Sequence, residues 1–404
     1  MKNKHSHSVI LLLLLSLGLQ VKAQQWMIPD LKDSVAFHSY YSLEATSNSL
    51  SSDFALRAIQ GGLIDDDLKL HTQNSLNKSD NRLGYQQTFS LLAGQRIGQG
   101  PWYFLTHYRH HSLTEVSFSR TAFELAFTGN ASTVGHELPF HLEYRNVNWQ
   151  SLQLGLHYQR QSHRFGFSPG IVSSAYFLEA GLKDATLYTS EDLSSMTLQT
   201  RAAVSWSDTT EQHQFGAGKG VNFDVYYGYH TSKQEFFISL ENFGIVSFDQ
   251  LQLHDNTDST WHFDGVSLNL FETEDFRFSV NQDSLKQWTG LRQPGSKRIM
   301  LPSHLTIGFK QKAGETFELG LYGRYHFYSM AQPEIHVLSG WRFHPQWKVM
   351  LSIAHGGYGS LKSGTHITAE LGNGFGLRFG SNNLAGMWIN QNTAADFYIS
   401  LYKF

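Results

Sequence analysis

Charged side chains recur at alternate positions of segments that are otherwise apolar. Asp224 interrupts the aromatic segment VNFDVYYGYH (221–230). The other members occupy one parity of later segments: Glu318, Arg324, His326, Glu334, Arg342, Glu370 and Arg378. Acids and bases are mixed, so they could pair across neighbouring strands and stabilise an interior, or form a ring that selects ions. A buried unpaired carboxylate is costly, so we expect Asp224 to pair with a neighbouring Arg or Lys.

The sequence gives less support to metal binding, calcium binding or catalysis. The 21 histidines include His110 and His111, but adjacent residues of a strand point to opposite faces and rarely share a metal ion. The acidic stretch HDNTDSTWHFDG (254–265) lacks the closing acid of a calcium loop, so we expect a solvated loop. No G-x-S-x-G occurs, and GAGKG (216–220) leads into a strand rather than a helix. We expect no enzyme, no metal and no cofactor.

The charged residues lie on segments with a period of two. In TFELGLYGRYHFYS (316–329), Phe317, Leu319 and Leu321 alternate with polar residues, as in a strand with one apolar and one polar face. Comparable strands are expected at 84–94, 102–110, 140–149, 151–160, 164–182, 196–206, 221–230, 235–243, 303–310, 334–343, 347–355, 366–371, 374–380 and 394–404. Weaker candidates are 39–45 and 53–59, and 270–291 is the best candidate for a short helix.

The N-terminus predicts export. Lys2 and Lys4 precede the apolar run Val9–Leu19, and Val21-Lys22-Ala23 offers small residues at the cleavage positions. This is the pattern of a secretory signal peptide (1–23) cleaved after Ala23, and its apolar run is too short to span a bilayer. With no cysteine, disulfides, thiolate catalysis and a lipid-bearing Cys are excluded. The net charge of −3 argues against nucleic acid as a partner.

Two all-β folds could bury such strands, a two-sheet sandwich or a membrane barrel with its apolar face toward lipid. Mean hydropathy is −0.32 although 14% of residues are aromatic, which is typical of a transmembrane barrel. We expect an antiparallel transmembrane β-barrel with an even number of strands, about 14 and within roughly 12–16. The aromatic segment bearing Tyr398, Tyr402 and Phe404 is expected to close it.

The expected barrel covers 81–404, with short turns on the side of the C-terminus. Residues 24–80 are expected to supply a plug or a periplasmic arm. The long segment 247–302 is expected to be an external loop whose aromatic residues fold over the mouth or contact a partner. Those aromatic residues are Trp261, Phe263, Phe271, Phe276 and Phe278.

Several motifs carry a resemblance. The segments 121–132 (TAFELAFTGNAS), 215–248, 301–310 (LPSHLTIGFK) and 380–388 (GSNNLAGMW) resemble an uncharacterised Bacteroidota outer-membrane barrel family, a domain of unknown function. That family is distantly similar to fatty-acid-transporter-type barrels and to barrels of the type IX secretion machinery. The resemblance implies a barrel that moves hydrophobic ligands or belongs to a secretion assembly, and it supplies no catalytic residues.

The expected location is the outer membrane, with its lipid and, during insertion, the barrel-assembly machinery as partners. The expected function is a passive channel or transporter for small solutes, which could be hydrophobic. The alternative is a non-enzymatic structural or interaction component of an outer-membrane or secretion assembly, with an envelope protein as partner. An open lumen would favour transport, and a collapsed lumen under an aromatic lid would favour the assembly role.

Overall fold

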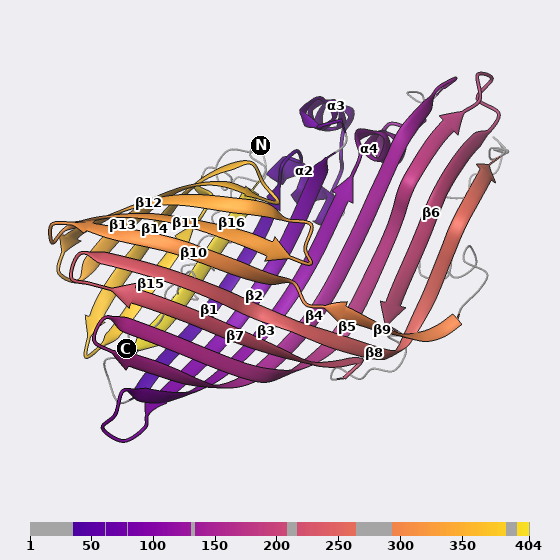
Figure 1. The fold of residues 1–404 in the computed structure, drawn as a ribbon. Helices are drawn as coiled ribbons and strands as arrows, with labels where there is room; N and C mark the ends of the chain where they lie inside the picture. Colours follow the sequence, from indigo (N-terminus) through magenta and orange to yellow (C-terminus); the bar gives the residue numbers. More distant parts are fainter. Residues whose placement is uncertain are drawn as a thin grey trace.

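The chain folds into a closed, all-β antiparallel barrel (Figure 1). The computed structural model describes residues 35–60, 62–78, 80–130, 134–207, 216–263, 293–384 and 394–403. Its strands are β1 (Val35–Ser47), β2 (Asn81–Arg96), β3 (Trp102–Phe118), β4 (Glu137–Arg160), β5 (His163–Thr189), β6 (Met196–Ser207), β7 (Gly218–His230), β8 (Gln234–Phe263), β9 (Gln293–Met300), β10 (Ser303–Ala313), β11 (Phe317–Phe327), β12 (Gln332–His344), β13 (Trp347–Gly357), β14 (Leu361–Gly372), β15 (Phe375–Ser381) and β16 (Ala394–Lys403). Three helices accompany them: α2 (Ser52–Gln60), α3 (Asp66–Ser75) and α4 (Arg120–Phe127).

The sheet closes where the two ends of the barrel sequence meet. β16 pairs with β1 over ten residue pairs from Phe37↔Lys403 to Thr46↔Ala394. The sheet contains 16 strands, two more than the expected 14 and at the upper limit of the expected range of 12–16. The number is higher because β5 and β8 are long enough for each to pair with two strands, one after the other, along the same edge. β7 and β6 pair with successive parts of β5, and β10 and β9 pair with successive parts of β8.

Period-two patterning sends apolar side chains outward along the wall. On β11, Phe317, Leu319, Leu321 and Tyr325 are exposed, whereas Tyr322 is buried inside. The exposed apolar residues on other strands include Leu152, Leu154, Leu156, Phe165, Phe167, Ile171, Val221, Phe236, Ile307, Phe309, Ile335, Val337, Trp341, Phe343, Trp347, Leu351, Ile353, Phe375 and Phe379. Membrane barrels present such a face to lipid, with the polar parity inside.

A lysine on this outer face should impair insertion. Leu321 lies in the middle of β11 and is 53% exposed, so Leu321→Lys should lower the stability of the barrel in bilayers by about 2–4 kcal/mol, the midplane penalty for a lipid-facing charge. Urea unfolding in lipid vesicles measures this. Leu63→Lys is the control, because Leu63 is 80% exposed in the connection between α2 and α3. Equal stability of the two variants would contradict a lipid-facing β11.

One part of the wall is much taller than the rest. β11 and β13 have 11 residues each, about 36 Å of strand, which suits a hydrocarbon layer of about 30 Å crossed at a tilt. β5 and β8 have 27 and 30 residues, about 90–100 Å of strand. Figure 1 shows β4, β5, β6 and β8 extending past the shorter strands.

The tall wall corrects the expectation of a long loop at 247–302. β8 continues to Phe263 because β6 pairs with its distal part from Leu251 onward, and β9 returns along β8 from Gln293 to Met300. The segments expected at 140–149 and 151–160 likewise form the single strand β4. The helix expected at 270–291 lies outside the described residues.

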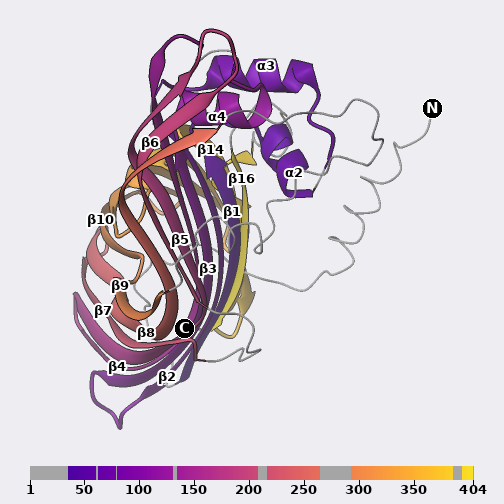
Figure 2. The same cartoon turned by 90° about the vertical axis from the view of Figure 1, so that its right-hand side faces the viewer.

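The three helices form a cap on the tall wall (Figure 2). Phe54 of α2 and Phe123 of α4 pack with Phe140 of β4 and Leu187 of β5 in one buried cluster. Ser119 begins α4 by accepting a hydrogen bond from the Ala122 N–H at 3.2 Å. The cap explains why 53–59, expected as a weak strand, is helical: Asp53 and Arg57 pair one turn apart while Phe54 faces the cluster.

The barrel also begins earlier than residue 81, because β1 already belongs to its wall. The two ends of the barrel differ in their connections. Turns at 161–162, 231–233, 314–316, 345–346 and 373–374 are short and lie at the end where β16 finishes. The cap and the connections 328–331 and 358–360 lie at the opposite end. No helix in the described part of the chain is long and apolar enough to cross a membrane.

Candidate functional site

Polar side chains fill the interior of the barrel because the inward parity of each strand carries them. β3 places His107, Arg109, His111 and Glu115 inside, all nearly inaccessible to solvent. They alternate with partly exposed residues, so the period of two that sets the lipid face also sets the interior.

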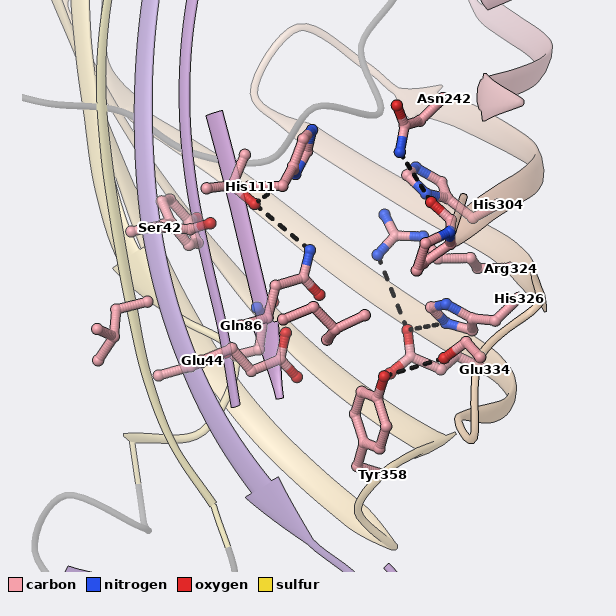
Figure 3. A pocket seen from close by; sticks show the side chains of 18 of the residues that line it. Ser42, Glu44, Gln86, His111, Asn242, His304, Arg324, His326, Glu334 and Tyr358 are labelled. Atoms are coloured by element: carbon pink, nitrogen blue, oxygen red, sulfur yellow. Dashed lines mark hydrogen bonds and ion pairs between the residues drawn. The ribbon is translucent and has the colours of Figure 1, made fainter. Parts of the chain in front are cut away.

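A cavity of about 100 Å³ lies in this interior and is lined by strands from both sides of the barrel. Figure 3 shows Ser42, Glu44 and Gln86 on one side, facing His304, Arg324 and His326 on the other. The first group comes from β1 and β2, and the second from β10 and β11. A cavity of this size with polar walls has room for several water molecules or one small polar solute.

Glu334 of β12 is the centre of the charge network at this cavity. Its Oε1 accepts a hydrogen bond from Lys362 Nζ at 2.9 Å. The Nε2 atoms of His336 and His326 lie 3.3 and 3.6 Å from its Oε2, and Arg324 Nη1 lies 3.9 Å from the same oxygen. Lys362 also reaches Glu44 of β1 at 3.3 Å, so the network joins β12 and β14 to the opposite wall.

Asp224 of β7 forms a second buried network beside the cavity. It pairs with Arg109 of β3, and both side chains are almost fully buried. Its Oδ1 also accepts hydrogen bonds from Gln153 Nε2 at 3.2 Å and from the Asn242 N–H at 2.7 Å. With these partners the Asp224 carboxylate is compensated, as a buried charge requires.

Two hairpin connections lie over the cavity, at the end of the barrel opposite the short turns. We call them the lid: residues 328–331 between β11 and β12, and residues 358–360 between β13 and β14. Ser329 and Tyr358 of the lid line the cavity. Tyr358 lies against Gly84 of β2, where any Cβ would sit 2.2 Å from the tyrosine ring.

Glu115 of β3 holds the lid to the wall. Its Oε1 accepts hydrogen bonds from Ser329 Oγ at 2.6 Å, from the Met330 N–H at 2.8 Å and from the Tyr358 hydroxyl. Arg145 of β4 lies 3.2 Å from Glu115 Oε2 and donates to the Tyr328 carbonyl at 2.8 Å. One fully buried carboxylate therefore fastens both hairpins to the wall.

The structure divides the charged residues expected in the lumen into two groups. Arg324, His326 and Glu334 line the cavity, and Asp224 lies next to it. The others lie away from it: Glu318 pairs with Lys348, Arg342 lies 3.9 Å from Glu370, and Arg378 donates to Thr368 Oγ1 at 3.1 Å. The eight residues therefore belong to several local groups and form no single ladder.

The structure describes some of the aromatic residues expected in the external loop and in the barrel-closing strand, and leaves others outside the described residues. The backbones of Trp261 and Phe263 belong to β8, whereas Phe271, Phe276 and Phe278 lie outside the described residues. Tyr398 is buried and hydrogen-bonded to His366, and Tyr402 donates to Glu370 at 3.4 Å. Phe404 also lies outside the described residues. Among the residues that the structure describes, no group of three or more His, Cys, Asp or Glu side chains could hold a metal ion.

Sequence reasoning missed Glu44, Arg109, Glu115 and Lys362. Arg109 lies within the expected strand 102–110, and Glu115 shares its inward parity, so a longer expected strand would have included Glu115 as well. Glu44 likewise follows Tyr40 and Ser42 at alternate positions. Their partners could not be found in this way, because Glu115 and Tyr358 are 243 positions apart.

The fold and the site together define the class of this protein. It is a closed antiparallel β-barrel with apolar side chains outside, polar side chains inside and a lid. Residues 30–376 match the model of a family described as "Family of unknown function (DUF5723)", and the chain belongs to this family. No match was found among curated proteins.

The chain is also similar to solved barrel structures. One is a deletion mutant of the monoaromatic hydrocarbon channel TodX, with 8% identity, a TM-score of 0.48 and coverage of 92% of this chain and 91% of that one. Another is the Pseudomonas putida toluene transporter TodX, with 9% identity, a TM-score of 0.46 and coverage of 93% and 90%. A third is a Pseudomonas aeruginosa FadL homologue, with 8% identity, a TM-score of 0.42 and coverage of 91% and 89%.

Proposed function

We propose that this protein is an outer-membrane barrel that acts as a passive channel or transporter for small solutes, opened and closed by the lid. The observation that carries the proposal is the polar cavity inside the barrel, lined by two hairpins that are fastened by one carboxylate. A barrel with a purely structural role needs no cavity between its walls. The cavity walls are charged, so the solute of this proposal is polar.

The orientation follows from the connections. Bacterial outer-membrane barrels have short periplasmic turns and longer external loops. In this proposal the end with short turns faces the periplasm, and the lid and the cap face the exterior. Residues 1–23 serve as the signal peptide, outer-membrane lipid contacts the apolar face, and the barrel-assembly machinery inserts the protein.

The small cavity represents a closed state, so transport requires the lid to move. The connections that would move are short and carry few bonds to the wall, whereas β11 and β13, which they follow, are held by long ladders to their neighbours. Segments with few bonds open at lower free energy than the elements they connect.

Liposome swelling tests the proposal. Purified protein is reconstituted into vesicles that are then diluted into isosmotic glycine, glycerol or raffinose. We expect swelling above protein-free vesicles with the two small solutes and none with the trisaccharide. A rate equal to that of protein-free vesicles with all three solutes would contradict a channel.

The cap favours a second candidate, an interaction component of an envelope assembly. The helices and the tall wall bury their own apolar cluster beyond the shorter strands, and a pore has no need of this addition. Affinity purification from native outer membranes tests it. A stoichiometric protein partner that is lost when α2 and α3 are deleted would support this role, and isolation of the barrel alone would contradict it.

A further inference from the structure

The cavity has two ends of opposite chemistry. On one side, Glu44 of β1 and Asp396 of β16 are directly opposite each other across a pair of strands, and both line the cavity. Like charges placed so are destabilising unless a cation compensates them. Lys362 Nζ lies 3.3 Å from Glu44 Oε1, but Lys362 is shared with Glu334, so one ammonium group serves three carboxylates at this cavity. Asp396 is 4% exposed, and its Oδ1 accepts hydrogen bonds from Ser381 Oγ and the Asn383 N–H, but its buried Oδ2 has no hydrogen-bond partner.

The other side offers donors without close acceptors. Among the described residues, the Arg324 guanidinium has two long contacts, from Nε to Thr306 Oγ1 at 3.5 Å and from Nη1 to Glu334 at 3.9 Å. On the neighbouring strands, His336 Nδ1 and Ser303 Oγ are buried without a hydrogen-bond partner, and His326 Nε2 has only the 3.6 Å contact with Glu334 Oε2. Glu334, the carboxylate that Arg324 contacts, is already shared with Lys362. Such buried polar atoms normally bind water or a ligand.

The charges around the cavity select among ligand classes. An anion would be attracted by Arg324 but repelled by Glu44, Glu334 and Asp396. A cation would be attracted by Glu44 and Asp396 but repelled by Arg324 and Lys362. A molecule that carries both charges complements both sides and leaves the net charge of the cavity unchanged. An arginine fork is suited to a carboxylate, and a pair of carboxylates is suited to an ammonium group.

We propose that the cavity binds a small zwitterion with one carboxylate and one ammonium group, such as a free amino acid of the size of glycine or alanine. The carboxylate lies toward Arg324 and Ser303, and the ammonium group lies toward Glu44 and Asp396. Figure 3 shows Arg324 and Glu44 on the two sides of the cavity. This inference rests on the proposed function, because it names the class of solute that the channel takes.

Isothermal titration calorimetry on the purified barrel in detergent tests the inference. Glycine is compared with its two halves, acetate and methylammonium, and with glycerol. We expect glycine to bind at least tenfold more tightly than any of the other three. Glu115→Gln is titrated in parallel, so that a closed lid cannot hide the site.

Variants assign the two ends. Arg324→Gln and Glu44→Gln should each weaken glycine binding at least tenfold, and Arg324→Lys should restore only part of the loss. Glu318→Gln is the control, because Glu318 pairs with Lys348 in the interior away from the cavity. Migration on a gel before and after heating shows that each variant still forms a barrel.

The outcomes separate this inference from the channel itself. Acetate or methylammonium binding as tightly as glycine would overturn it in favour of a simple ion site. No heat with glycine in either the wild type or Glu115→Gln would overturn it in favour of a cavity that holds water. Glycine binding without any swelling of vesicles would leave the site in place and remove the channel, and swelling without binding would do the reverse.

Discussion

Glu115→Gln should convert a mostly closed barrel into a mostly open one. The carboxylate is fully buried and receives hydrogen bonds from Ser329, Met330 and Tyr358 of the lid. A hydrogen bond to a charged group contributes about 1.5–3 kcal/mol, so weakening this set should raise the open fraction about 10- to 100-fold. Single-channel recording in planar bilayers measures it as the time spent conducting.

Two companion variants make this result specific to the lid. Glu179→Gln is the matched control, because Glu179 also pairs with Arg145, at 3.0 Å, but no bond joins it to either hairpin among the described residues. Gly84→Ala leaves every charge in place and displaces the Tyr358 ring, so it should also increase conduction. Conduction that rises equally with Glu179→Gln, or with neither lid variant, would contradict the role of Glu115.

Asp224→Asn should be among the most destabilising single changes inside the barrel. It leaves the Arg109 guanidinium buried without its counter-charge, and removing one partner of a buried ion pair costs about 3–5 kcal/mol. Asn keeps the shape of the side chain, so the loss is electrostatic. Urea unfolding in lipid vesicles measures the free energy of unfolding.

The double variant Asp224→Asn with Arg109→Gln distinguishes a broken pair from a damaged fold. With both charges removed, we expect a smaller loss of stability than in Asp224→Asn alone. Asp184→Asn provides an exposed comparison, since its pair with Arg201 is 3.6 Å long and mostly accessible, and it should lose at most about 1 kcal/mol. Additive losses in the double variant would show that the two residues act independently.

Much of the wall could be predicted because alternate side chains of a barrel strand point to opposite faces, so the polarity of a side chain indicates the face on which it lies. In β10, β11 and β13 the apolar parity of the sequence is the exposed parity of the structure. The segment 53–59 was misjudged because a short apolar pattern fits a strand or a helix, and only the packing of Phe54 on Phe123 decides between them. The length of β8 was missed because its distal half is a strand by virtue of tertiary contacts, namely its pairing with β6.

The site was less predictable than the wall. Parity suggested that Asp224, Arg324 and Glu334 face inward, yet it could not indicate which of them meet. Arg324 and Glu334 are opposite each other on neighbouring strands, whereas Lys362 and Glu44 meet across 318 positions of sequence. The lid depends on contacts of this second kind, and no local pattern marks Glu115 as their centre.

The most direct test of the central claim, that a solute path runs through the cavity beneath the lid, uses a single introduced thiol. The chain has no cysteine, so Ser42→Cys places one reactive group on the cavity wall with little change in volume. Intact cells are treated with a membrane-impermeant maleimide, with Leu63→Cys as the exposed control. We predict slow labelling of Ser42→Cys alone and labelling at least tenfold faster when Glu115→Gln is added. Labelling of Leu63→Cys with none of Ser42→Cys, even beside Glu115→Gln, would contradict the path.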